Sequence, residues 1–81
     1  DLLDGEEKTF YATGNVASSN FYQQGKLHGS SCSWNEQGIL VFEAEYEQGL
    51  KHGKFNKYYD DGRPRVFQQF KNDELVSKKT F

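Results

Sequence analysis

Two histidines, His28 and His52, stand 24 residues apart and are the first side chains in this sequence that could bind a metal ion. If they occupy equivalent turns of stacked hairpins, a strand spacing of ~4.8 Å places them about 10 Å apart. Zinc holds its nitrogen ligands at roughly 2.0–2.1 Å, so one ion cannot bridge the pair without rearrangement. We therefore expect no metal site and interpret both histidines as turn-stabilising residues.

The carboxylates Glu43 and Glu45 and the thiol of Cys32 are the remaining candidates for chemistry. Two residues on one strand face lie about 6.7 Å apart, a separation that overlaps the carboxylate pair of inverting glycosidases. Nothing in the sequence indicates a pocket around them, so a solvated strand face is the simpler interpretation. Cys32 has no neighbouring base and fits a small apolar filler. We predict a protein that is not an enzyme and that uses no cofactor.

Length and composition limit the protein to one small domain of 81 residues. Aromatic residues make up 16% of the chain, which is too many for a disordered segment. The net charge of −2 argues against a nucleic-acid binder, whose affinity depends on neutralising phosphates. The chain begins at Asp1 and has no methionine, so we expect a fragment or a processed product.

The sequence repeats with a period of 24 residues. Glycines recur in three columns, which are Gly14/Gly38/Gly62, Gly5/Gly29/Gly53 and Gly25/Gly49. Aromatic residues recur in two columns, which are Phe10/Trp34/Tyr58 and Tyr22/Tyr46/Phe70. We therefore predict a single array over residues 1–81, with repeats at about 6–29, 30–53 and 54–77 and with partial repeats at 1–5 and 78–81.

Each repeat has the pattern of a β-hairpin. Apolar and acidic residues alternate from Ile39 to Tyr46, as in a half-buried strand, and glycine-containing turns recur at short spacing. Residues 12–14, 36–38 and 60–62 predict tight turns, while residues 23–29 and 47–53 predict wider ones. The fold class is therefore an all-β array of antiparallel β-hairpin repeats that form one elongated twisted sheet.

The two aromatic columns predict the source of cohesion. Because the period is even, equivalent residues keep one face, and we expect the two columns to interleave into a single aromatic ladder. Truncating a buried Trp34 would then cost about 3–5 kcal/mol. Asp73 and Ser77 replace column glycines in the last repeat, which we interpret as a cap of the array.

These motifs resemble the bacterial variant of the MORN repeat. An aromatic residue is followed four positions later by glycine, and then comes a Tyr-x-x-Gly segment that ends in His-Gly at residues 28–29 and 52–53. The resemblance covers nearly the whole chain, although Asp73 and Ser77 depart from it. It implies an array of β-hairpins that serves as an interaction or scaffold module, in some members attached to enzymes or linked to membranes. Bacterial members are often described as antitoxins of toxin–antitoxin pairs, largely by association.

We therefore predict a noncatalytic repeat scaffold for protein–protein interaction, and an antitoxin-like role is one form of it. The exposed edge at Thr9, Phe10 and Tyr11 is the candidate partner site and could also support self-association. The first alternative is peripheral binding to an anionic membrane through a lysine stripe, formed by Lys51, Lys54, Lys57 and Lys78, in which Lys54 and Lys78 share a repeat column. The second alternative is an accessory repeat segment of a larger enzyme.

Overall fold

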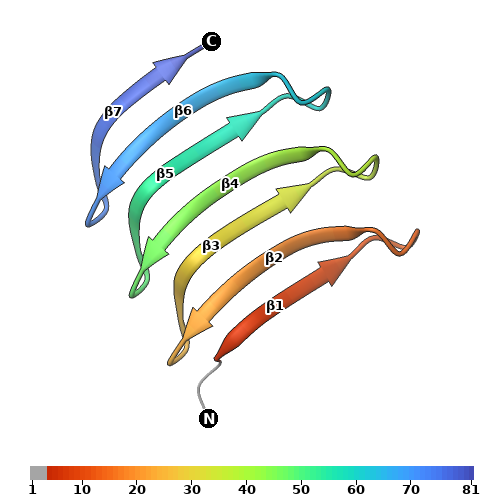
Figure 1. Ribbon diagram of the computed structural model, residues 1–81, viewed down its shortest axis with the longest axis horizontal. Coiled ribbons are helices and arrows are strands. Elements are labelled where there is room, and N and C mark those ends of the chain that lie inside the picture. Colours follow the sequence, from red (N-terminus) through yellow and green to blue (C-terminus); the bar gives the residue numbers. More distant parts are fainter. Residues whose placement is uncertain (1–3) are drawn as a thin grey trace.

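The chain folds into one open antiparallel sheet, which the computed structural model describes for residues 4–81 (Figure 1). Its strands lie side by side in the order of the sequence: β1 (Gly5–Phe10), β2 (Val16–Gln23), β3 (Lys26–Trp34), β4 (Leu40–Glu47), β5 (Leu50–Tyr58), β6 (Pro64–Lys71) and β7 (Glu74–Thr80). The described residues form no α-helix, and so none that could cross a membrane. The predicted all-β array of hairpins is confirmed. Its extents of 35 × 34 × 10 Å make the described sheet about as wide as it is long.

The connections on one side of the sheet are three-residue turns, as the sequence predicted. In the first, the Gly14 amide donates to the Tyr11 carbonyl at 2.9 Å, and the Tyr11 amide donates to the Asn15 carbonyl at 2.8 Å. Gly14 has a φ of +96°, which suits a turn that ends in a left-handed residue. The same two hydrogen bonds recur 24 and 48 residues later in the chain.

The connections on the other side are two-residue turns, so the predicted wider turns are wrong. The first contains only Gln24 and Gly25, both with positive φ, at 51° and 80°. This pair of angles matches the type I′ turn that suits the twist of a hairpin. The last such turn, Asn72 and Asp73, keeps positive φ without glycine because Asn and Asp tolerate that conformation. The segment after each turn, which the spacing of the glycines predicted to belong to the turn, is the start of the next strand.

Gly49 occupies the second of these two-residue turns, and its predicted position within a wider turn over residues 47–53 is wrong. It follows Gln48, and the two have φ values of 85° and 51°, as in the first turn of this kind. Strand β5 begins at the very next residue, because the cross-strand ladder with β4 resumes there. Gly49 is exposed, and its amide donates a hydrogen bond of 2.7 Å to the Leu27 carbonyl of the preceding hairpin. Asp73, in the same column, donates in the same way to the Lys51 carbonyl at 2.9 Å, so the turn residues at these two positions also connect successive hairpins.

Gly29 and Gly53 lie inside β3 and β5, where each has a φ above +90° and accompanies a shift in strand register. Ser77 is the equivalent residue in β7 and has no positive φ. The register shift between β6 and β7 is smaller by one residue than that between β4 and β5. Phe67 therefore pairs with Lys79, whereas the larger shift would pair it with Thr80. A one-residue change of register moves the side chains that follow it to the other face of the sheet. The part of β7 from Ser77 onward therefore presents its side chains to the opposite faces from the equivalent residues of β5, whereas Leu75 keeps the face of its equivalent, Lys51.

The two aromatic columns lie on opposite faces, so the predicted single ladder is wrong. Ala44 pairs with Phe55, and Tyr46 lies two residues from Ala44 on the same face. Cys32 pairs with Glu43, and Trp34 lies two residues from Cys32 on the other face. We call these two surfaces the Tyr46 face and the Trp34 face. A further register shift turns Leu40 toward Trp34, away from the face that its alternation predicted.

Both faces of the sheet are open to solvent, because no second layer covers either one within the described residues. Ala44, at 1% exposure, is the one apolar residue among them that is buried. Trp34 is only half-buried. The predicted loss of about 3–5 kcal/mol of stability on its truncation assumed a buried residue and therefore does not apply. Cohesion comes instead from backbone ladders and from side-chain contacts on each face.

Candidate functional site

A cluster of aromatic rings lies on the Tyr46 face over strands β4 to β6. Phe55 is at its centre, with its ring centroid 5.0 Å from that of Phe42, 6.4 Å from that of Tyr46 and 5.4 Å from that of Phe70. All three contacts are edge-to-face, which is a favoured arrangement for aromatic rings. Phe55, rather than a residue of the Trp34 column, therefore interleaves between Tyr46 and Phe70.

Three lysines surround this cluster on the same face. Lys51 places its Nζ 4.9 Å from the Phe55 ring centroid and 5.0 Å from that of Phe70. Lys57 pairs with Phe42, and Lys78 lies opposite Gln68, which pairs with Phe55. None of the three lysines forms an ion pair with another residue in 4–81. We call this set of rings and lysines the aromatic–lysine patch.

Lys54 does not belong to this patch, so the predicted stripe of four lysines is wrong. It lies on the Trp34 face, where its Nζ is 3.7 Å from Glu43 Oε2. Lys54 and Lys78 share a repeat column but lie on opposite faces, because the register of β7 differs from that of β5. The structure thus brings Lys51, Lys57 and Lys78 to one face and separates Lys54 from them.

Phe42 and Phe55 do not repeat, so the repeat columns did not predict them as site residues. The residues 24 positions before them are Ser18 and Ser31, and the Ser31 hydroxyl donates a hydrogen bond to Asn20. At these two positions the Tyr46 face is therefore polar on β2 and β3 and aromatic on β4 and β5. Departures from the repeat were the signal that could have found the patch, because the fold forms with serine at the equivalent position of the preceding repeat in both cases.

The Trp34 face carries a polar network in which Glu43 and Glu45 already have hydrogen-bond partners. Glu43 accepts hydrogen bonds at Oε1 from the Tyr58 hydroxyl at 2.5 Å and from Asn56 Nδ2 at 3.2 Å. Glu45 accepts from the Lys54 amide at 3.1 Å, and its Oε1 occupies the space that a Cβ on Gly53 would need. This network ties neighbouring strands together and leaves its acids little capacity for a partner.

Electrostatics support a structural role for this network. Burial would raise the pKa of the Glu43 carboxyl, but the hydrogen bonds from Tyr58 and Asn56 and the charge of Lys54 outweigh it and lower that pKa. Burial, followed by the hydrogen bond to Glu43, raises the pKa of Tyr58. Burial and then the charge of Glu43 raise the pKa of the Cys32 thiol, which disfavours the nucleophilic thiolate.

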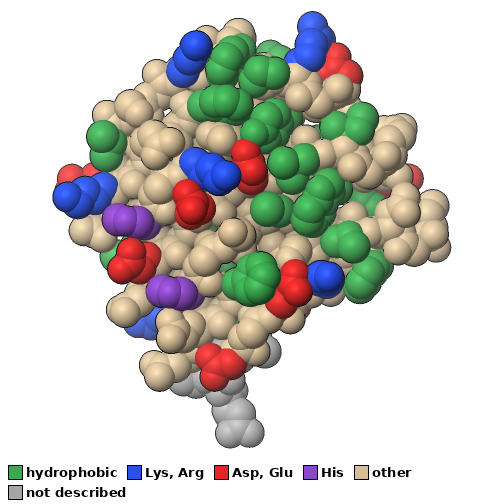
Figure 2. Space-filling view, viewed as in Figure 1, with side chains coloured by type: hydrophobic (Ala, Val, Ile, Leu, Met, Phe, Trp, Pro, Cys, Tyr) green, Lys and Arg blue, Asp and Glu red, His purple; other side chains and the backbone are tan. Residues whose placement is uncertain are grey.

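The histidines lie in β3 and β5, close to the two-residue turns that precede these strands, and Figure 2 shows both near one side of the sheet. His28 Nδ1 accepts a hydrogen bond from the Gln48 amide at 3.2 Å, and Asp4 Oδ1 accepts the equivalent bond from the Gln24 amide at 2.8 Å. His52 Nε2 lies 3.6 Å from Glu47 Oε2. His28 thus stabilises the next turn, and residues 4–81 contain no group of three or more side chains that could hold a metal ion.

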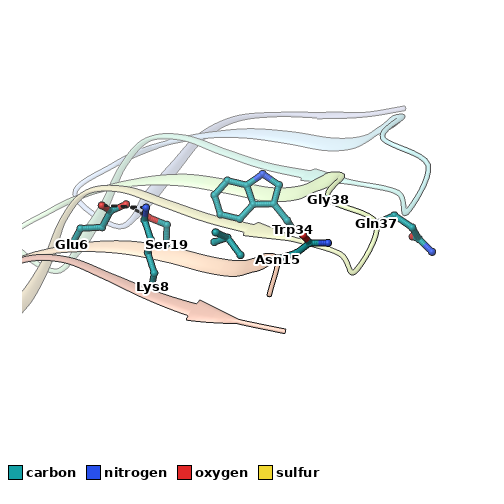
Figure 3. A pocket seen from close by; sticks show the side chains of 8 residues that line it. Glu6, Lys8, Asn15, Ser19, Trp34, Gln37 and Gly38 are labelled. Carbon is teal, nitrogen blue, oxygen red and sulfur yellow. Dashed lines mark hydrogen bonds and ion pairs between the residues drawn. The ribbon is translucent and has the colours of Figure 1, made fainter. Parts of the chain in front are cut away.

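A hollow of about 530 Å³ lies beside Trp34 on the same face (Figure 3). Asn15 and Val16 line it on one side, and Glu6 and Lys8 at one end form an ion pair of 3.9 Å. The residues 24 positions after Asn15 and Val16 are Ile39 and Leu40, which are larger and more apolar. A Cβ added to Gly62 would lie 3.4 Å from Ile39 Cγ2, whereas a Cβ added to Gly38 would meet no atom within 4 Å. The hollow therefore arises because small and polar residues replace the aliphatic pair.

The predicted partner edge lies at and just beyond strand β1. All residues of β1 are exposed, Phe10 by 60%, and the Thr9 hydroxyl is hydrogen-bonded to that of Ser18 at 2.5 Å. Tyr11 follows the strand and donates a hydrogen bond from its hydroxyl to the Trp34 carbonyl at 2.6 Å. The opposite edge, β7, exposes Leu75 by 52% and Val76 by 65%. Both edges expose apolar side chains next to unpaired backbone groups.

These features define a class of protein: an open, single-layer sheet of consecutive antiparallel hairpins, without a covering helix in the part that the structure describes. Residues 3–24, which include all of β1 and β2, match the MORN repeat variant. MORN repeats are generally repeat modules for binding, which agrees with a noncatalytic scaffold. No curated protein and no solved structure matches the chain.

Proposed function

We propose that this protein is a noncatalytic repeat scaffold that mediates protein–protein interaction. The observation that carries the proposal is the open edge of β1, where every residue is exposed and Phe10 stands 60% in solvent. An edge strand offers unpaired N–H and C=O groups to a partner strand, and an exposed aromatic side chain adds contact area. A partner that pairs with β1 would extend the sheet by one strand.

Photo-crosslinking combined with hydrogen exchange tests this proposal. A benzophenone amino acid replaces Phe10 in one variant and Tyr59, which is 45% exposed on a turn, in the control variant. We expect a discrete protein adduct from position 10 and none from position 59. The purified partner should then slow amide exchange in Gly5–Phe10. The proposal fails if position 10 gives no discrete adduct, or if the purified adduct protein leaves these amides unprotected.

An antitoxin-like role is a narrower form of this proposal, which the resemblance to MORN repeats suggests. It requires that the partner be a toxic protein whose activity this chain suppresses. Co-expression of the chain with the crosslinked partner gives a direct test through growth rescue. Loss of rescue in a variant with a charged residue at Phe10 would connect the suppression to the β1 edge.

Peripheral binding to an anionic membrane is the second candidate, and the shared face of Lys51, Lys57 and Lys78 favours it. Each basic residue near an anionic surface contributes about 1 kcal/mol. Sedimentation with anionic and with neutral vesicles separates this candidate from a protein scaffold. The third candidate, an accessory segment of an enzyme, is tested by the full-length gene, which would encode a catalytic domain beside the array.

A further inference from the structure

We infer that the aromatic–lysine patch on the Tyr46 face binds an acidic, extended peptide segment of a partner protein that also carries apolar side chains. This inference rests on the proposed function for the existence of a protein partner, and it assigns that partner a second surface and a chemistry. The patch is separate from the β1 edge, because it lies on the face of strands β4 to β7.

The first support is the contrast in charge between the two faces. On the Trp34 face Glu43, Glu6 and Glu47 each lie within 4 Å of a basic side chain. On the Tyr46 face the Nζ atoms of Lys51, Lys57 and Lys78 form no ion pair among residues 4–81, and the nearby Asp73 carboxylate accepts a hydrogen bond from the Lys51 backbone amide at 2.8 Å. Complementary charge brought by a partner would pair these cations, and such pairing is a main determinant of partner choice.

The second support is the apolar content of the patch. Phe42, Phe55 and Phe70 are half-buried by one another and keep part of each ring in solvent. Leu75 pairs with Phe70 on the same face and is 52% exposed. Interface cores are enriched in aromatic residues, with polar groups around them. A ligand with alternating acidic and apolar side chains would satisfy both the lysines and the rings.

The third support is that the patch departs from the repeat. The equivalents of Phe55 are Ser31 and Glu7, and the equivalent of Lys57 is Ser33. The hairpin fold forms with polar residues at these positions, so the fold itself does not require the aromatic and basic ones. Exposed residues that the fold does not require are the ones free to serve recognition.

Charge and shape favour a peptide over a lipid surface. The formal net charge of the chain is −2, and the sheet is 10 Å thick, close to the Debye length of about 8–10 Å at physiological salt. Without the three lysines the rest of the chain has a formal net charge of −5 (−2 − 3), which offsets the lysines toward an extended anionic surface. A short segment in direct contact with the patch interacts mainly with the lysines.

The probe for this inference is a peptide of about ten residues with alternating Glu and Val, since a strand rises ~3.4 Å per residue and the sheet spans 35 Å. A second peptide carries Lys in place of Glu. Nuclear magnetic resonance titration locates binding, and calorimetry measures affinity. We expect the acidic peptide to shift resonances of Phe42, Phe55 and Phe70, and the basic peptide to shift none.

Two matched triple variants separate local recognition from net charge. Lys51→Gln/Lys57→Gln/Lys78→Gln removes the cations of the Tyr46 face, and Lys8→Gln/Lys54→Gln/Lys79→Gln removes three from the Trp34 face. Each takes the net charge from −2 to −5. We expect about tenfold weaker binding of the acidic peptide for the first variant and less than about twofold change for the second.

A variant of the aromatic part completes the test. Phe55→Ser introduces the residue that the preceding repeat carries at this position, Ser31, and should weaken peptide binding about fivefold while β-sheet circular dichroism persists. Equal losses in both lysine variants, or resonance shifts confined to the Trp34 face or to β1, would overturn the inference. Binding to anionic vesicles without binding to the acidic peptide would overturn it in favour of a membrane. A partner crosslinked at position 10 would still support the proposed function in any of these cases.

Discussion

The Tyr58 hydroxyl donates a 2.5 Å hydrogen bond to Glu43 Oε1 across the Trp34 face, from the end of β5 to the middle of β4. The two residues are 15 apart in sequence, and Asn56 Nδ2 donates to the same oxygen at 3.2 Å. The bond therefore links an aromatic residue of the repeat to a carboxylate with a side-chain exposure of only 19%. In a sheet without a covering layer, such polar contacts take over part of the role of an apolar core.

Replacing Tyr58 by Phe should lower the free energy of unfolding by about 1–2 kcal/mol, because a hydrogen bond to a charged, partly buried acceptor is lost. Chemical denaturation at neutral pH measures the effect. Tyr59→Phe is the control, since Tyr59 is 45% exposed and lies on a turn. A loss for Tyr58→Phe no greater than that for the control would show that the hydrogen bond contributes nothing.

Acid should weaken the fold in part through Glu43, whose pKa lies below its ordinary value of 4.5 in the folded protein. A lowered folded pKa means that the contribution of Glu43 is complete above 4.5 and is lost as the pH falls below it. Glu43→Gln removes the titrating group, so its stability should fall less steeply than that of the wild type in this acidic range. Denaturation curves along a pH series make the comparison, and parallel curves would contradict the assignment.

Gly38 should tolerate Asn and reject Val. Its φ is +84°, and a Cβ there would meet no atom within 4 Å, so only the backbone conformation limits the substitution. Val strains in this region by about 1–3 kcal/mol, whereas Asn adopts it readily. Melting temperatures of both variants give the measurement, and equal losses would show that the positive φ is not the constraint.

Ser77→Gly should restore the register that β3 and β5 have. A glycine at this position permits the positive φ seen at Gly53, at +94°, and so allows the larger register shift. Phe67 would then pair with Thr80 in place of Lys79. Cross-strand nuclear Overhauser contacts report the pairing, and an unchanged contact between Phe67 and Lys79 would contradict the role assigned to the glycine.

Trp34→Ala should cost about 1–3 kcal/mol, less than the 3–5 kcal/mol of a fully buried aromatic residue, because Trp34 is only half-buried beside a hollow. Thermal unfolding followed by circular dichroism measures the loss. Tyr22→Ala on the opposite face is a useful comparison, since Tyr22 is also half-buried. A variant that melts like the wild type would show that the Trp34 column does not stabilise the sheet.

The amino-acid sequence by itself determined the strands, the antiparallel hairpins and the three-residue turns at Gly14, Gly38 and Gly62. These features depend on local signals: alternation along a strand and glycine where φ must be positive. It did not determine the width of the other turns. Gly49 lies in a turn and Gly53 lies in a strand, yet both have positive φ, so the spacing of glycines does not separate a turn from a register shift inside a strand.

Only the tertiary structure decided which side chains share a face. Whether two residues on neighbouring strands share a face depends on whether the register between the strands shifts by an even or an odd number of residues. One extra residue moves the side chains that follow it to the other face. That parity placed Trp34 and Tyr46 on opposite faces, separated Lys54 from Lys78, and brought Phe55 between Tyr46 and Phe70. The aromatic–lysine patch exists because of these registers, which the spacing of residues along the chain does not reveal.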